Sequence, residues 1–77
     1  MPHYYFHLRQ NDGVFKDTRG GEFDDLEAAW NWALSDVRAI VKEGQLDGPI
    51  DQHWLEISDP TGRTVAILPF ERALRLQ

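Results

Sequence analysis

Pro2 is the first residue whose chemistry could support catalysis. Removal of Met1 would expose a secondary amine, and such an amine can act as a general base near neutral pH. Tautomerases use an N-terminal proline in this way. In this chain a predicted hairpin follows the first strand where those enzymes have a helix, and no pair of arginines is placed to bind an acidic substrate. A small enzyme that uses Pro2 is therefore the alternative hypothesis.

Three histidines raise the question of a metal site. The spacing of His3 and His7 would suit one ion on a helix, but on a strand it separates them by about 13 Å, at roughly 3.3 Å per residue. His53 could approach either of them only through strand pairing. We therefore predict neither a metal site nor a cofactor.

Acidic residues gather just before the predicted helix. Asp24, Asp25 and Glu27 are explained as helix-start residues, because carboxylates cap free N–H groups and interact favourably with the positive end of the helix dipole. The same charges argue against a phosphate bound at Gly20 and Gly21. This segment therefore predicts a helix start and no ligand.

The elements that must position these residues begin with a hairpin. Residues 4–9 alternate as a strand does, with one face predicted to lie in the core (Tyr4, Phe6, Leu8) and the other facing outward (Tyr5, His7, Arg9). Residues 10–13 contain Asn, Asp and Gly, which tolerate tight-turn conformations. We expect residues 14–17 to pair back as a second strand.

A helix is predicted over residues 24–43. Asp24 is the expected N-cap, with Glu27 completing a capping box and Phe23 and Ala28 forming a hydrophobic staple. Gly44 suits the position just after the helix. The helical wheel places Trp30 and Val37 near the middle of the apolar stripe, so both should be deeply buried.

A second hairpin is expected after the helix. Residues 53–58 and 63–68 form its strands, and the Asp59–Gly62 segment between them has the composition of a turn. Pro69 should end the strand pairing, and residues 70–74 are predicted to make one helical turn with Phe70, Ala73 and Leu74 on a common side. The predicted fold class is α+β, in the order β-β-α-β-β. An antiparallel sheet of two hairpins carries one long amphipathic helix packed on one face.

Trp32 lies outside the apolar stripe of the predicted helix, between Ala28 and Ala39. Two interpretations remain open. The C-terminal segment 70–76 could cover the indole ring, or the ring could mark a subunit or partner interface. Together with the outward-facing Tyr5 and His7 of the first strand, these three helical residues are the interface candidates.

Composition limits the class of protein. The chain has 77 residues, no cysteine, 42% hydrophobic residues and a net charge of −5. It is long enough for a single domain, 1–77, with a small core that a second copy could help to complete. Dispersed basic residues and the negative charge exclude nucleic acid as the expected partner, and no apolar run predicts a membrane span. We expect a cytoplasmic protein that forms a homo-oligomer.

Four motifs resemble a known family. They are the opening Met1–His7, the Asp12-Gly13 turn, the helix entry Gly20–Ala29 and the late Asp59–Phe70 segment. They resemble a family of short alphaproteobacterial proteins, of the rhizobial type, known as a domain of unknown function. The resemblance spans nearly the whole chain and implies a stand-alone domain, usually cytoplasmic, without assigned catalytic residues, cofactor or ligand.

The sequence therefore favours a binding role over catalysis. We predict a non-enzymatic interaction module that is homodimeric and binds a protein or a small ligand through an exposed sheet face or edge. The other hypothesis, a tautomerase-like enzyme, would require Pro2 for all turnover.

Overall fold

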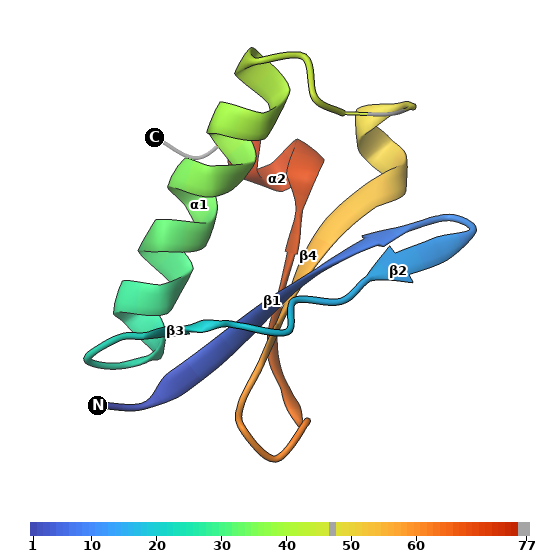
Figure 1. Cartoon of the computed structure of the whole chain (residues 1–77). Helices are drawn as coiled ribbons and strands as arrows, with labels where there is room; N and C mark the ends of the chain where they lie inside the picture. Colours follow the sequence, from blue (N-terminus) through green and yellow to red (C-terminus); the bar gives the residue numbers. More distant parts are fainter. Residues whose placement is uncertain (47, 76–77) are drawn as a thin grey trace.

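The computed structural model describes residues 1–46 and 48–75 as an antiparallel five-stranded sheet with one main helix, an α+β fold. Four of the strands have the order β2-β1-β4-β5. The fifth, β3, also pairs with β1, at the end of β1 that β2 does not reach. Figure 1 shows α1 lying across one face of this sheet. The elements in chain order are β1 (His3–Gln10), β2 (Gly13–Phe15), β3 (Gly21–Glu22), α1 (Leu26–Lys42), a 3-10 turn (Ile50–Gln52), β4 (His53–Ser58), β5 (Thr64–Pro69) and α2 (Phe70–Arg75).

Helix α1 begins one residue later than its sequence signals suggest. The N-cap is Asp25, whose carboxylate accepts a hydrogen bond of 2.9 Å from the backbone N–H of Ala28. The prediction of Asp24 as the cap was therefore wrong, and Glu27 stands one position too early for a capping box. Adjacent aspartates offer nearly equivalent caps, so local sequence does not separate them.

The C-terminal end of α1 follows the predicted pattern. Gly44 has a φ of +70°, a conformation that glycine adopts without steric cost. The N–H of Gly44 donates to the carbonyl of Val41, and the N–H of Gln45 donates to that of Ile40. This pair of bonds is a Schellman motif, which satisfies carbonyl groups that the helix leaves open.

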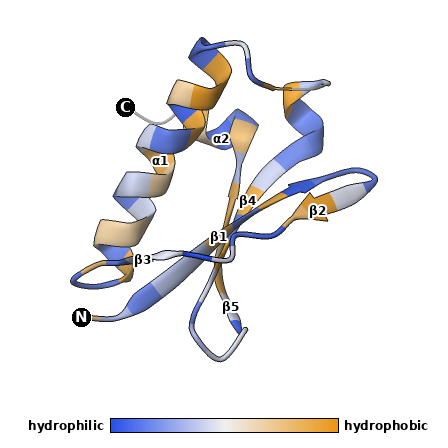
Figure 2. Ribbon diagram, in the orientation of Figure 1, coloured by the Kyte–Doolittle hydropathy of each residue, from blue (hydrophilic) through white to orange (hydrophobic). Residues whose placement is uncertain are grey.

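The core lies between the inner face of α1, the middle of the sheet and α2. Val37, Ile57, Leu68 and Phe70 are its largest fully buried side chains. In Figure 2 strongly apolar residues gather where the strands meet the helices, whereas the ends of the hairpins are more polar. Val37 is buried as predicted, but Trp30 is only half-buried, so the middle of the stripe lies nearer Ala33 and Val37.

Helix α2 replaces the single C-terminal turn that the sequence predicts. Phe70 and Ala73 are buried in the core, but Leu74 is 42% exposed. The expected common face of these three residues is therefore wrong for Leu74. The last two residues of the chain, including Leu76 of the predicted covering segment, lie outside the described residues.

The strand bounds depart from expectation mainly in the first hairpin. β4 occupies the predicted residues 53–58, and β5 is shifted by one residue to Thr64–Pro69. β2 ends at Phe15, so Lys16 and Asp17 are not part of the strand. The two-residue β3 was not predicted, because Gly21 and Glu22 have no alternating pattern to signal it.

The burial of the core predicts a clear contrast between two isoleucines. Ile57 is fully buried on β4, whereas Ile67 on β5 is 52% exposed. Ile57→Ala should lower the free energy of unfolding by about 2 to 5 kcal/mol, since it leaves a cavity. Ile67→Ala should change it by only about 0.5 kcal/mol. Denaturant unfolding of both variants measures the difference, and equal effects would show that the helix covers the other face of the sheet.

Candidate functional site

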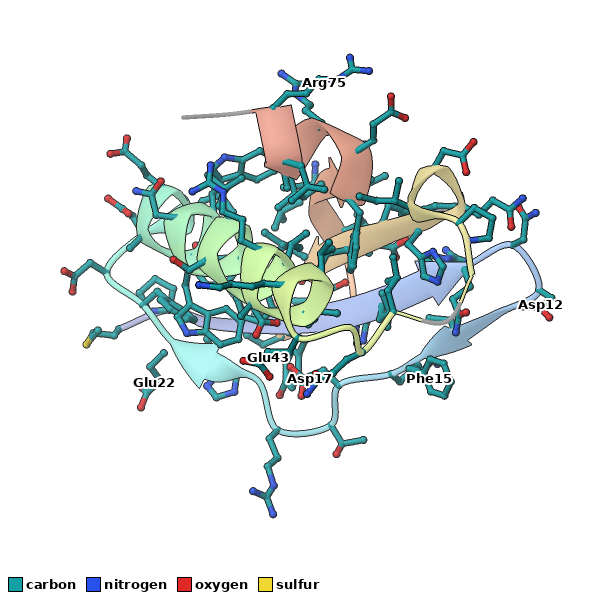
Figure 3. The ribbon with its side chains drawn as sticks, turned by 90° about the horizontal axis from the view of Figure 1, so that it is seen from above. Asp12, Phe15, Asp17, Glu22, Glu43 and Arg75 are labelled. Atoms are coloured by element: carbon teal, nitrogen blue, oxygen red, sulfur yellow. The ribbon has the colours of Figure 1, made fainter. Side chains whose placement is uncertain are left out.

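Hydrogen bonds centred on Asp17 hold the segment between β2 and β3 against β1. Asp17 Oδ2 accepts a hydrogen bond of 3.1 Å from the N–H of Phe6. Its Oδ1 accepts bonds of 3.0 Å from the N–H groups of Arg19 and Gly20. The N–H of Asp17 in turn donates to Nδ1 of His7 at 3.0 Å. Figure 3 shows Asp17 on this connection and Phe15 on the adjoining β2.

Asp17 fills a gap in the strand pairing of β1. β2 pairs with Leu8, Arg9 and Gln10, and β3 pairs with His3 and Tyr4, so Phe6 lies between the two paired stretches. The carboxylate satisfies the Phe6 N–H, which no strand residue reaches at that point. A side chain thus continues the edge of the sheet across the gap.

The electrostatics of Asp17 follow from these contacts. Burial alone would raise its pKa, but the N–H groups of Gly20, Phe6 and Arg19 and the nearby His7 outweigh burial and hold the pKa below its ordinary value. The ionised form is therefore the one that the folded protein favours.

Three aromatic rings pack between this connection and α1. The ring of Trp32 lies 4.8 Å from that of Phe6 and 6.0 Å from that of Phe23, measured between centroids. Phe6 and Phe23 meet edge to face at 5.6 Å. These separations are those of favourable aromatic pairs. Trp32 nevertheless remains 45% exposed, because its contacts cover only part of the indole.

A pocket of about 520 Å³ lies beside these rings. Its walls come from β1, the connection that follows β2, and the outer side of α1. Four of its residues are aromatic, two are glycines and three are charged. The residues that line it are Phe6, Leu8, Phe15, Lys16, Asp17, Gly20, Gly21, Phe23, Trp32 and Asp36. Its size and composition match those of small-molecule sites, which span roughly 300 to 1,000 Å³.

Asp36 is the second carboxylate of the pocket. It follows Trp32 by one helical turn, so the two side chains are neighbours on α1. Burial raises the pKa of Asp36, the opposite direction from Asp17. Within residues 1–46 and 48–75, no hydrogen bond or ion pair to its carboxylate is found. The pocket therefore combines aromatic rings with a half-buried acceptor that has unused capacity.

The structure divides the predicted interface residues between two surfaces. Trp32, Ala28 and Ala39 lie on α1 at helical spacings of four and seven residues, and Asp36 joins the same face. Tyr5 and His7 alternate with the helix-facing Phe6 on β1, so they belong to the opposite face of the sheet. The ring contacts of Trp32 are with Phe6 and Phe23, and neither belongs to the predicted C-terminal cover.

Pro2 lies just before β1 and is exposed. Its carbonyl accepts a hydrogen bond of 3.0 Å from the N–H of Phe23. Pro2 does not line the pocket between α1 and the β2–β3 connection. The structure thus places this candidate outside the site described here.

The histidines are distributed along the sheet. His3 Nε2 lies 2.8 Å from the carbonyl oxygen of Arg19, and His7 accepts from Asp17. His53 is opposite Gln10, at the far end of β1 from His3, and its Nδ1 donates to the carbonyl of Pro49. Strand pairing therefore does not bring His53 to the other two. In the described part of the chain, no three His, Asp or Glu residues form a group that could hold a metal ion.

Sequence reasoning missed Asp17, Asp36 and Phe23 as site residues. Asp36 could have been found from its spacing to Trp32, since residues four apart share a helix face. Phe23 was assigned only to a staple at the helix start, and its ring packs on Phe6 and Trp32. The bonds of Asp17 to Arg19 and Gly20 are local, but its contact with β1 gave no signal, because Phe6 lies on a different strand.

Asp17→Asn should lower the free energy of unfolding by about 1 to 3 kcal/mol at neutral pH, because the amide NH₂ would oppose the N–H of Phe6 or leave another donor unpaired. The folded-state pKa of Asp17 is depressed, so its contribution is present above the ordinary value of 3.8 and is lost as the pH falls through the folded-state pKa. The difference between parent and variant should therefore shrink in acid. Unfolding curves at several pH values measure it.

Asp51→Asn is the matched control for this experiment, since Asp51 is exposed in the 3-10 turn. It should leave both the stability and its acid dependence close to those of the parent. An equal loss in both variants would show that general charge, and not the link to β1, explains the effect.

Comparison with known proteins supplies the family. No curated protein and no solved structure matches the chain. No helix within residues 1–46 and 48–75 has the length and apolar character needed to cross a bilayer. The model of one family, described as a domain of unknown function (DUF6894), matches residues 3–71. Because this match covers almost all of the chain, including both walls of the pocket, the chain belongs to the DUF6894 family.

Proposed function

We propose that the protein is a non-enzymatic interaction module that binds a small ligand in the pocket between α1 and the β2–β3 connection. The observation that supports this proposal is the pocket itself, with Trp32, Phe23 and Phe6 presenting ring surface beside a half-buried carboxylate. Apolar rings supply binding energy, and a few polar groups fix the orientation of a ligand.

The way the pocket is built supports a role in ligand binding. Asp17 holds the connection to β1 through the N–H of Phe6 and stabilises the connection itself through the N–H groups of Arg19 and Gly20, so the wall opposite α1 is fixed before any ligand arrives. A preformed wall lowers the ordering cost of binding. Gly20 brings the backbone close to β1, since a Cβ atom there would lie only 2.4 Å from the carbonyl oxygen of Tyr4.

A fragment titration tests this function. Phenethylammonium, phenethyl alcohol and hydrocinnamate share one apolar body and differ in charge. At least one of these probes should shift the amide NMR signals of pocket residues. Trp32→Ala should weaken the binding of that probe by about tenfold, because an aromatic contact is lost. Leu74→Ala is the control, since Leu74 is 42% exposed against 45% for Trp32 but lies outside the pocket. Shifts confined to other surfaces would contradict the proposal.

We also propose that two copies associate through β5 and the sheet face that α1 leaves uncovered. β5 is an edge strand of the sheet, and edge strands can pair with a second chain. Ile67 on β5 and Val14 on β2 are 52% and 41% exposed. The ion pair between Arg9 and Glu56, 2.9 Å long, places both signs of charge on this face. Such a face can be self-complementary about a two-fold axis.

Mass in solution tests the association. The parent should be dimeric at high micromolar concentration, and Ile67→Glu should give a monomer because it places a charge in the apolar interface. Trp32→Glu should remain dimeric, since Trp32 lies on the other side of the sheet. A monomeric parent, or dissociation by the Trp32 variant alone, would reject this surface.

A further inference from the structure

We propose that the ligand of the pocket is a small organic cation, with its ammonium group between the Asp36 carboxylate and the ring of Trp32. Its apolar body would lie against Phe6 and Phe23. This inference rests on the proposed binding function and adds the chemical class of the ligand.

The carboxylate of Asp36 supplies the charge that a cation needs. It lines the pocket and has no hydrogen-bond or ion-pair partner within residues 1–46 and 48–75. Burial disfavours its ionised form and raises its pKa. A bound cation would compensate this unfavourable burial, whereas an anion would increase it.

Trp32 supplies the second half of the site. The indole is the strongest of the aromatic rings in attracting a cation, which binds within about 6 Å of the ring centroid. Trp32 and Asp36 are four residues apart on α1, a spacing that brings side chains within about 5 to 6 Å at Cβ. One ammonium group can therefore contact both.

The other charged residues of the pocket are Asp17 and Lys16. Asp17 already accepts three backbone hydrogen bonds, so its charge is largely used within the protein. Lys16 is exposed, and the described residues include no ion pair between it and Asp36. Its ammonium group is free to turn toward water while a ligand occupies the interior. The chain as a whole has a net charge of −5, which favours the approach of cations.

The three phenethyl probes distinguish charge from apolar contact. Phenethylammonium should bind about tenfold more tightly than phenethyl alcohol, as expected for a hydrogen bond to a charged group, and hydrocinnamate should bind most weakly. In Asp36→Asn the ammonium and the alcohol should bind within about twofold of one another. Asp51→Asn makes the same change on an exposed residue outside the pocket and should preserve the tenfold preference.

Stability measurements keep the test interpretable. The pKa of Asp36 is raised in the folded state, so its ionisation above the ordinary value of 3.8 favours the unfolded chain. Asp36→Asn removes this effect and should melt at the same temperature as the parent or higher. A loss of binding in this variant would then not reflect a loss of the fold.

Each outcome has a definite consequence. Equal binding of the ammonium and the alcohol to the parent would overturn the cation inference and leave the binding pocket standing. Tightest binding of hydrocinnamate would overturn it in favour of an anion held by Lys16. If none of the probes shifts the amide NMR signals at roughly 20 mM, a concentration at which even weakly binding fragments are detected, both proposals would be overturned. If a capped lysine amide binds more tightly than phenethylammonium, the small-molecule ligand is overturned, and the ligand of the pocket is instead a lysine side chain of a partner protein.

Discussion

The hydrogen bonds of the Asp17 carboxylate are the constraint on which the rest of the site depends. β1 is paired along one edge with β4 but shares its other edge between two short strands, and the Phe6 N–H falls in the gap. A strand residue opposite Phe6 would have continued the pairing along this edge of β1. Instead, the carboxylate of Asp17, which belongs to no strand, accepts the hydrogen bond from this N–H. The N–H of Phe6 at this edge thus has a hydrogen-bond acceptor although no strand pairs with it.

The pocket follows from that arrangement. The connection that Asp17 anchors leads to β3, and β3 leads directly to Phe23, whose ring meets Phe6 and Trp32. The anchored connection forms one wall and α1 forms the other. The core contains Val37, Ile57 and Leu68, and Phe6 packs against it, so the aromatic cluster is a more open extension of the core. Its rings are half covered because no further element of the described chain lies over them.

The sequence allowed prediction of the elements whose signals are local. The turn composition of Asp59–Gly62 marked the end of β4, whose predicted bounds 53–58 are those observed, and Gly44 marked the end of α1 because that position requires a positive φ. The start of α1 was missed by one residue, since Asp24 and Asp25 are both good caps. Leu74 and Trp30 are less buried than predicted. A helical wheel shows which way a side chain points, but not how far the neighbouring element extends to cover it.

The site itself was not predictable, for a physical reason that Asp17 and Asp36 illustrate. Both are acidic residues in a chain rich in them, and only the spacing of Asp36 to Trp32 distinguishes either from Asp51 or Asp12. Tertiary structure separates them: backbone N–H groups and His7 lower the pKa of Asp17, and burial raises that of Asp36. The first carboxylate stabilises the fold, whereas the second is less favourable folded than unfolded. A ligand that restores the interactions lost by Asp36 on folding would recover free energy that the protein alone does not, and this difference is what makes Asp36, and not Asp17, the group through which a ligand gains affinity.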